Sequence, residues 1–451
     1  MTTTFLAALL RIEPQRLQRI LGIGIPIIGG MLSQSLINLV DAAMVGRLGD
    51  TALAAVGIGG YASFVMVSMI MGLSAGVQAL VARRHGAGDH QRVHEPLMAG
   101  LLLAVLLSIP LSALFIWLAP WMFGYLTSNP EVAAIAVPYF QWRAAATIAV
   151  AMNFVFRGFW SGIGETRRYL HTLLFMHSIN IIVSYVLVFG VGDWEGIGAV
   201  GSGIGTALAL VFGTALYSWL TFTWQRQRLG QIRMPTRATL LQLGRLAWPN
   251  CAQQTLFALG ISVMFWIIGQ IGTAEQAIAH ILISLQLMLI LPAVGMGIAA
   301  TSLVSHALGA GNCEDAYRWG WEVVRVAMFS LAILGLPLWL APELILNLFT
   351  HEQQLIQLGT APLRLTGLVI VLEVTAMVLT QALLGAGASR KVMRINLAMQ
   401  WGMLLPLAYL TGPVLGFGLF GIWLLQGMQR ISLSIIYSVI WRQRHWSQLV
   451  L

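Results

Sequence analysis

Charged residues and cysteines are scarce in this sequence. Only 9% of its 451 residues are charged, whereas 58% are hydrophobic and the mean hydropathy is +0.81. Because soluble globular proteins carry about 25% charged residues, this composition excludes a soluble domain. Of the two cysteines, Cys251 falls within a predicted span and Cys313 in a predicted cytoplasmic loop, so neither indicates a disulfide or a metal site. No G-x-x-x-x-G-K-[ST] sequence occurs, so ATP hydrolysis through a P-loop is excluded as well.

Apolar stretches of about 20 residues or more recur along the whole chain, and each can cross a hydrocarbon core about 30 Å thick. Backbone groups in lipid must be satisfied within the protein, so continuous runs of this length predict helices. The sequence predicts an all-α membrane protein with twelve transmembrane helices. The predicted spans are residues 18–44, 52–82, 96–118, 132–162, 170–190, 196–222, 240–270, 277–305, 318–340, 356–386, 392–412 and 416–440.

The basic residues predict the orientation, because cytoplasmic loops are enriched in Lys and Arg. With the N-terminus inside, all but Arg47, Arg143 and Arg364 of the 25 basic residues fall on the cytoplasmic side, and Arg157 and Arg430 are placed near cytoplasmic helix ends. We therefore expect a multi-pass protein of the cell (inner) membrane with both termini cytoplasmic. The net charge of +9 follows from this orientation and suits anionic membrane lipids, so no nucleic acid partner is indicated.

An internal repeat appears when the chain is shifted against itself by 223 residues. Pro26 then falls on Pro249, "VARRHGAG" on "VSHALGAG", and eight glycine pairs coincide where chance gives roughly 2.7. Two six-helix halves in the same orientation form a parallel repeat, which in transporters holds substrate near the midplane. The predicted division is an N-terminal half at 1–222, a basic cytoplasmic linker at 223–239 and a C-terminal half at 240–451.

Polar residues form stripes on three of the predicted helices. Asp41 lies inside the first span, where a carboxylate costs about 2.5–3.5 kcal/mol on insertion scales and faces a bundle interior or a wet cavity. Gln34 and Asn38 share its helix face at i, i+4, i+7 spacing. The other stripes are His177, Asn180 and Ser184 at i, i+3, i+7, and Ser202 with Thr206 at i, i+4. Together they predict a shared polar pocket in the N-terminal half.

Three motifs carry a resemblance to a known family. The first-span sequence "LVDAAMVGRLGDTALAAVG", the loop "RRHGAGD" and the segment "FRGFWSGIGETRR" resemble the multidrug and toxic compound extrusion (MATE) family. An acid fifteen residues after Pro26 is more similar to the DinF-type branch than to the NorM type. The resemblance implies a V-shaped twelve-helix fold and a multidrug antiporter that exports hydrophobic, mostly cationic compounds, and so confers drug resistance, in exchange for H⁺ or Na⁺.

The resemblance also implies roles for individual residues. The cation-coupling site corresponds to Asp41, Tyr139, Asn180, Ser202 and Thr206. Ser184 stands where the DinF-type pattern has a second acid; with one carboxylate, we expect a single proton on and off Asp41, whose charged form desolvation disfavours. Pro26 removes a backbone hydrogen bond and is a candidate bend for the conformational change. The candidate substrate-binding residues are Gln34, Asn38, Asn153, His177, Gln254 and Glu373.

The C-terminal half has one acid in a predicted span, Glu373 in "GLVIVLEVTAMVL". Its position matches an acid of the NorM-type branch, but the partner acid expected in the seventh span is replaced by Phe257, with Gln254 nearby. A cation site in this half therefore looks incomplete.

Several alternatives stay open at this point. A Na⁺-coupled exporter fits the same resemblance, and a flippase for lipid-linked sugars in the same superfamily would use Arg143 and Arg364 near the outer face. An intramembrane enzyme would need a second catalytic group within reach of Asp41, and none occurs at helical spacing. We predict a transporter that is not an enzyme, with no metal or cofactor beyond H⁺ or Na⁺ as coupling ion, acting on small drugs or toxic cations as a functional monomer.

Overall fold

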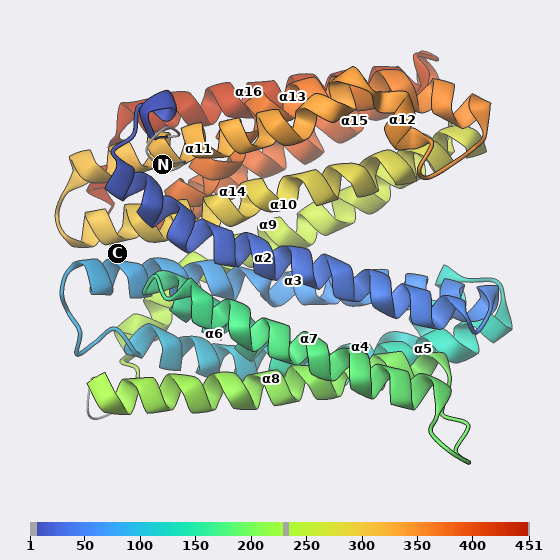
Figure 1. Ribbon diagram of the computed structural model, residues 1–451, viewed down its shortest axis with the longest axis horizontal. Helices are drawn as coiled ribbons and strands as arrows, with labels where there is room; N and C mark the ends of the chain where they lie inside the picture. The colour runs from blue at the N-terminus through green and yellow to red at the C-terminus, as the bar shows by residue number, and fades with distance from the viewer. Residues whose placement is uncertain (1–6, 229–233, 450–451) are drawn as a thin grey trace. The chain divides into compact units, whose positions relative to one another are not determined.

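The computed structural model describes residues 7–228 and 234–449. Residues 1–6, 229–233 and 450–451 lie outside the description, and they include five residues of the predicted linker 223–239. Within the described ranges the chain is α-helical (Figure 1), and the one β-type pairing there is an isolated bridge between Val191 and Trp194.

The helices follow the predicted spans. In the first half they are α2 (Pro14–Gly46), α3 (Asp50–Gly86), α4 (Glu95–Leu126), α5 (Pro130–Ala145), α6 (Thr147–Gly162), α7 (Thr166–Phe189) and α8 (Ala199–Arg228). In the second half they are α9 (Arg237–Gly269), α10 (Thr273–Gly309), α11 (Cys313–Leu340), α12 (Pro342–Leu346), α13 (Gln353–Gly385), α14 (Ser389–Leu397), the π-helical η1 (Ala398–Leu404), α15 (Leu405–Tyr409), the π-helical η2 (Leu410–Val414), α16 (Gly418–Gln443) and the short 3₁₀ helix η3 (His445–Gln448).

Ten helices of the described chain are long and apolar enough to cross a membrane as single pieces. The other two predicted spans are composite. Residues 130–162 form α5 and α6, separated at Ala146, whose φ of −76° and ψ of −3° interrupt the helix. Residues 389–414 run through α14, η1, α15 and η2, so the helix there widens from α to π at two places. The predicted all-α membrane class is confirmed.

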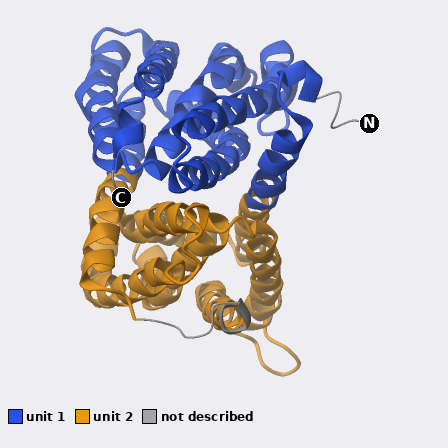
Figure 2. Cartoon of the chain, turned by 90° about the vertical axis from the view of Figure 1, so that its left-hand side faces the viewer, with its two compact units in different colours: residues 1–28, 256–451 blue, residues 29–255 orange. Residues whose placement is uncertain are grey.

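The chain packs into two compact units, shown in different colours in Figure 2. One unit comprises residues 29–255, and the other comprises residues 1–28 with 256–451, apart from the undescribed residues. The unit boundaries therefore fall inside α2 and α9, the first span of each half. The predicted halves, 1–222 and 240–451, follow the sequence repeat, whereas the two units follow the packing. The predicted division into halves stays a prediction.

Helices pack by the same scheme in each unit. The second span packs on the fourth, as α3 on α6 in one unit and α10 on α13 in the other. The third span also packs on the fourth, as α4 on α6 and α11 on α13. The fifth span packs on the sixth, as α7 on α8 and η2 on α16. Two units with the same packing are what a parallel duplication of six helices predicts.

Glycines explain why the first spans are shared between units. Gly72 of α3 lies against α9, where an added Cβ would be 2.7 Å from the carbonyl carbon of Asn250. In the other unit, a Cβ on Gly295 of α10 would be 2.5 Å from Cγ1 of Ile28 in α2. The 223-residue shift carries Gly72 onto Gly295 and Ile28 onto Cys251, which follows Asn250. Each second span thus lets a first span approach closely, because glycine has no side chain there.

Two further repeated glycine pairs form turns. Gly88 and Gly311, after α3 and α10, have φ of +71° and +75°, and Gly164 and Gly387, after α6 and α13, have φ of +83° and +93°. Left-handed backbone of this kind favours glycine. The repeat therefore preserves turn geometry at the same two places in each half.

Polar clusters hold the first turns of α2 and α9 in their units. Arg16 of α2 bonds Glu322 and Asp315 of α11 at 2.6 and 2.5 Å, and its guanidinium lies 3.7 Å from the centre of the Trp319 ring. At the corresponding position of α9, Thr239 donates to Glu95 of α4 at 3.2 Å. It also accepts a hydrogen bond from Arg84 of α3 at 2.9 Å. Both clusters lie on the side predicted to be cytoplasmic.

Replacing Arg16 by Ala tests the first cluster. We expect the free energy of unfolding to fall by about 1–3 kcal/mol, because two hydrogen bonds to charged groups are lost and two acids remain without their common partner. Denaturant unfolding of the purified protein in detergent measures the change. Arg318→Ala is the matched control, since the Arg318–Glu314 pair is 66% and 52% exposed and such pairs contribute about 0–1 kcal/mol. Equal losses in the two variants would contradict a special role for Arg16.

Candidate functional site

Five of the predicted coupling residues gather where α5, α7 and α8 meet in the unit of residues 29–255. Asn180 of α7 donates through Nδ2 to the Thr206 hydroxyl of α8 at 3.1 Å, and Thr206 donates to the Ser202 carbonyl at 2.9 Å. Ser184, one turn after Asn180, presses against Gly205 of α8. The closeness of α7 and α8 therefore follows from the small residues of "GSGIGT" at 201–206.

Tyr139 of α5 completes this group. Its ring is 4% exposed and lies between two glycines, since a Cβ on Gly59 of α3 or Gly203 of α8 would be 2.7 or 2.9 Å from ring carbons. Gly203 follows Ser202 directly, so the ring adjoins the polar face of α8. The guanidinium carbon of Arg143 lies 6.0 Å from the centre of the Tyr139 ring.

The polar stripes of α2 and α7 face each other. Nδ1 of His177 lies 2.6 Å from Ser33 Oγ, and Nε2 lies 3.2 Å from Gln34 Oε1. Gln34 in turn donates to Asn38 Oδ1 at 3.3 Å. The predicted residues Gln34, Asn38 and His177 are thus brought into one hydrogen-bonded chain. The predicted stripe did not include Ser33, which directly precedes Gln34 in the sequence and also contacts His177.

The order of contacts along α2 and α7 shows that the two helices run in the same direction. Gly30 faces Tyr169 and Leu173, and three to four residues later Ser33 and Gln34 bond His177. Seven residues beyond Gln34 is Asp41, and seven beyond His177 is Ser184. At 1.5 Å per residue, both lie about 10 Å further along, so Asp41 is level with Ser184 and about one helical turn beyond Asn180.

Three polar atoms at this level have no partner. Among the residues that the structure describes, Asp41 Oδ1, Asn180 Oδ1 and Ser184 Oγ are buried without a hydrogen bond. Buried polar atoms normally form hydrogen bonds. Unpaired buried oxygens therefore indicate a place where a hydrogen-bond donor or a cation can bind. Arg143 is the charged side chain that acts electrostatically on Asp41.

The orientation of the Asn180 amide follows from its neighbours. Thr206 gives its hydroxyl hydrogen to the Ser202 carbonyl, so the Thr206 oxygen is left to accept a hydrogen bond. Asn180 must therefore turn its NH₂ group toward Thr206. Its oxygen remains as an acceptor without a donor, which a proton on a neighbouring carboxylate or a small cation would satisfy.

The other predicted residues of this unit serve contacts between helices. Asn153 of α6 donates to the Leu210 carbonyl at 3.3 Å and accepts from Thr214 at 3.1 Å, which fixes it to α8. Gln254 of α9 lies 3.1 Å from the Met71 sulfur of α3. Their roles in substrate binding stay predictions.

Glu373 and Pro26 belong to the other unit. Pro26 lies within α2, two residues before the unit boundary. Glu373 of α13 forms an ion pair with Arg430 of α16. The sequence reasoning missed this pair because it counted Arg430 among the residues near cytoplasmic helix ends, whereas Arg430 lies twelve residues after the start of α16 and thirteen before its end. A lone Arg deep in one apolar span and a lone acid in another are the signal that could have paired them.

Within residues 7–228 and 234–449, no three His, Cys, Asp or Glu side chains gather as metal ligands do. The described helices and the polar residues gathered on α2, α5, α7 and α8 are those of a multi-pass α-helical membrane protein.

The profile of the MatE family matches residues 26–186 and 249–410, two stretches that begin 223 residues apart. The chain therefore belongs to the MatE family, and the resemblance seen in its motifs is confirmed. It is 28% identical to a probable multidrug resistance protein NorM of Agrobacterium fabrum, over 89% of this chain and 88% of that one. It is 24% identical to a probable NorM of Thermotoga maritima over 91% and 89%, and 27% identical to the multidrug resistance protein PmpM of Pseudomonas aeruginosa over 89% and 85%.

Solved structures share the fold. An outward-facing multidrug resistance MATE family transporter of the MOP superfamily superimposes with a TM-score of 0.89 at 21% identity, covering 96% of this chain and 97% of that one. A MOP superfamily transporter from Pyrococcus furiosus gives 0.86 at 22% identity, covering 95% of each chain. The predicted MATE fold is confirmed, while the assignment to the DinF-type branch stays a prediction.

Replacing Gly205 by Ala tests whether the close approach of α7 and α8 shapes the pocket. An added Cβ would meet the side chain and backbone of Ser184, so α7 must shift, at a cost of about 1–3 kcal/mol. We expect drug export to fall several-fold in cells at equal protein level. Gly57→Ala is the control, since nothing lies within 4 Å of a Cβ there. Unimpaired export by Gly205→Ala would show that the pocket tolerates a wider helix spacing.

Proposed function

We propose that this protein is a multidrug exporter that moves hydrophobic, mostly cationic compounds out of the cell in exchange for H⁺ at Asp41. Membership of the MatE family supports transport, and the names of the relatives NorM and PmpM support multidrug efflux as the activity. The distribution of basic residues supports an inner-membrane protein with both termini cytoplasmic.

The observation that carries the coupling proposal is the set of unpartnered atoms around one carboxylate. Asp41 is the one acid of residues 29–255 that lies within a span away from its ends. A proton on Asp41 neutralises its carboxylate and adds a hydrogen-bond donor to a group of residues in which Asn180 Oδ1 and Ser184 Oγ are unpartnered. One proton therefore removes the negative charge of Asp41 and supplies one of the missing hydrogen-bond donors.

The exchange then has two states. Ionised Asp41 attracts a cationic drug or holds the pocket open from the cytoplasmic side. A proton from outside neutralises Asp41, engages Asn180 and releases the drug outward, and the proton leaves to the cytoplasm when a drug binds again. The exposed amides of Gln34 and Asn38 line the same face of α2 and extend the pocket toward solvent.

The energetics favour a pH gradient as the driving force. A membrane potential acts on net charge, at about 2.3 kcal/mol per charge per 100 mV. One proton moving in for one monovalent drug moving out transfers no net charge, so the potential contributes nothing to that exchange.

Na⁺ is the alternative coupling ion that the same atoms favour. Carboxylate, amide and hydroxyl oxygens are hard ligands for small cations, and Asp41, Asn180 and Ser184 offer one of each. A single carboxylate gives such a site little charge, which is why H⁺ is preferred here.

Ethidium efflux from energised cells or vesicles tests the proposal. We expect an imposed pH gradient to drive efflux by the wild type and an imposed Na⁺ gradient alone to drive none. Asp41→Asn should reduce pH-driven efflux to the background rate, because the amide cannot release a proton. Asp193→Asn, an exposed acid in the loop after α7, is the matched control and should transport like the wild type.

Two results would count against this account. Full efflux by Asp41→Asn would make Asp41 a structural residue. Efflux driven by Na⁺ alone would replace H⁺ by Na⁺ as the coupling ion at the same atoms.

A further inference from the structure

The ion pair between Arg430 and Glu373 lies deep within helices. Glu373 is twenty residues after the start of α13 and twelve before its end, and Arg430 is similarly central in α16. Their side chains are 11% and 14% exposed, and Arg430 Nη1 donates to Glu373 Oε2. An isolated charge at such a position is costly, so each group here neutralises the other.

Neighbouring contacts hold α16 in register with α13. The Ser434 hydroxyl donates to the Leu372 carbonyl at 2.7 Å and lies one turn from Arg430. A Cβ on Gly427 would be 3.4 Å from Val369, so the helices approach closely on the other side of the pair. The guanidinium is therefore held opposite Glu373 by the packing of both helices.

A small, partly open cavity lies beside the pair. A cavity of about 10 Å³ beside the pair is lined by side chains that include Gln286, Gln426 and Thr366, and that volume is about one water molecule. Thr366 already accepts from Trp423 Nε1 at 3.2 Å and donates to the Pro362 carbonyl at 3.0 Å. The role of Glu373 in substrate binding stays a prediction.

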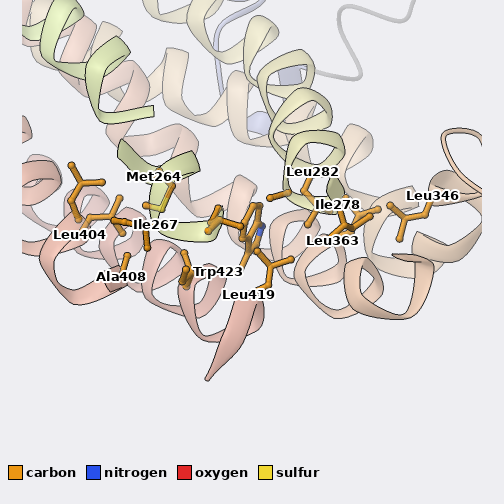
Figure 3. Close-up of a cluster of buried hydrophobic side chains, with 14 of the residues drawn as sticks. Met264, Ile267, Ile278, Leu282, Leu346, Leu363, Leu404, Ala408, Leu419 and Trp423 are labelled. Carbon is orange, nitrogen blue, oxygen red and sulfur yellow. The ribbon is translucent and has the colours of Figure 1, made fainter. Parts of the chain in front are cut away.

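The repeat shows that the two halves carry their ionisable groups differently. The positions 223 residues after Asp41, Asn180 and Ser184 are Met264, Met403 and Leu407. Met264 lies in the buried apolar cluster with Ile267, Leu404 and Trp423 (Figure 3). Conversely, the positions that correspond to Glu373 and Arg430 in the first half are Val150 and Ala207. The first half has an acid whose Oδ1 atom lacks a partner, and the second has an acid with a cation of its own.

We propose that the Arg430 guanidinium acts as a resident cation that closes the Glu373 carboxylate to small external cations, so that the C-terminal half takes up no coupling ion. The covalently held guanidinium is always charged and is present at the carboxylate at high effective concentration, so a free monovalent ion competes poorly with it. The proposal concerns binding in the C-terminal half alone and does not depend on which ion couples at Asp41.

Removing the guanidinium should open a cation site. All variants are made in an Asp41→Asn background, so that ion binding in the N-terminal half does not contribute and a failure here is separate from a failure of the export proposal. The apparent unfolding midpoint is measured in detergent while Na⁺ replaces N-methylglucamine at constant ionic strength. For Arg430→Gln we expect a saturable rise of about 2–4 °C, because a bound ion stabilises the folded state by mass action.

Control variants assign that shift to Glu373. Arg430→Gln with Glu373→Gln should lose the Na⁺ response, and Arg430→Lys, which keeps a cation, should show none. Arg364→Gln removes an exposed arginine from α13 and should also show none. A folded Arg430→Gln protein without a Na⁺ response would overturn the proposal, as would a Glu373-dependent Na⁺ response in the parent with Arg430 intact.

A second measurement needs no change at Arg430 and so holds even if that variant fails to fold. Dicyclohexylcarbodiimide labels carboxyl groups that carry a proton in apolar surroundings. In the wild type we expect mass spectrometry to find label on Asp41 and none on Glu373. Labelling of Glu373 that Na⁺ prevents would show a carboxylate open to exchange and would overturn the proposal.

Discussion

The structure depends on one constraint, which is that hydrocarbon does not solvate polar groups. A charged group inside a span is either paired with another group of the protein or remains unpaired and able to bind an ion. At the predicted cytoplasmic side, Arg16 pairs with Asp315 and Arg84 pairs with Glu95, and both acids lie in the first turn of a helix. Deep in α13 and α16, Glu373 and Arg430 find each other. Asp41 Oδ1, Asn180 Oδ1 and Ser184 Oγ find no partner among the described residues. In the proposed exchange this unpaired carboxylate is the group that takes up the coupling ion.

The two halves thus repeat the packing of their helices but not the positions of their ionisable residues. Gly72 and Gly295 repeat the close crossing of a first span, and Gly88 and Gly311 repeat a left-handed turn, because both are requirements of backbone geometry. The residues around Asp41 are free of that requirement, and the position that corresponds to Asp41 in the second half is Met264, within an apolar cluster. The two units share one packing scheme. Among the described residues, an acid within a span that has an unpartnered buried oxygen, Asp41, lies in the unit of residues 29–255.

Sequence patterns predicted the spans well because length and hydropathy alone determine what can cross a membrane. They also placed Asn180 with Ser184 and Ser202 with Thr206 on common helix faces, because the helical repeat determines which residues share a face. Other features needed the fold. The break at Ala146 and the π-helical turns in residues 398–414 leave no mark in hydropathy. The pairing of Arg430 with Glu373 depends on how α13 packs on α16, and the sharing of α2 and α9 between units depends on contacts that one helix's own sequence does not specify.

The central claim is that export is coupled to one ion at Asp41 and that the C-terminal half binds no coupling ion. The most direct test is to find, in proteoliposomes, the gradients at which net transport stops. Ethidium and pH gradients are imposed together, and the pH difference that stops net ethidium movement is found at two membrane potentials. For one proton against one monovalent cation, a tenfold ethidium gradient should be balanced by about one pH unit at both potentials, since each factor of ten is worth about 1.4 kcal/mol. A balance point that moves with the potential would show that more than one charge enters per drug, and would contradict coupling through Asp41 alone.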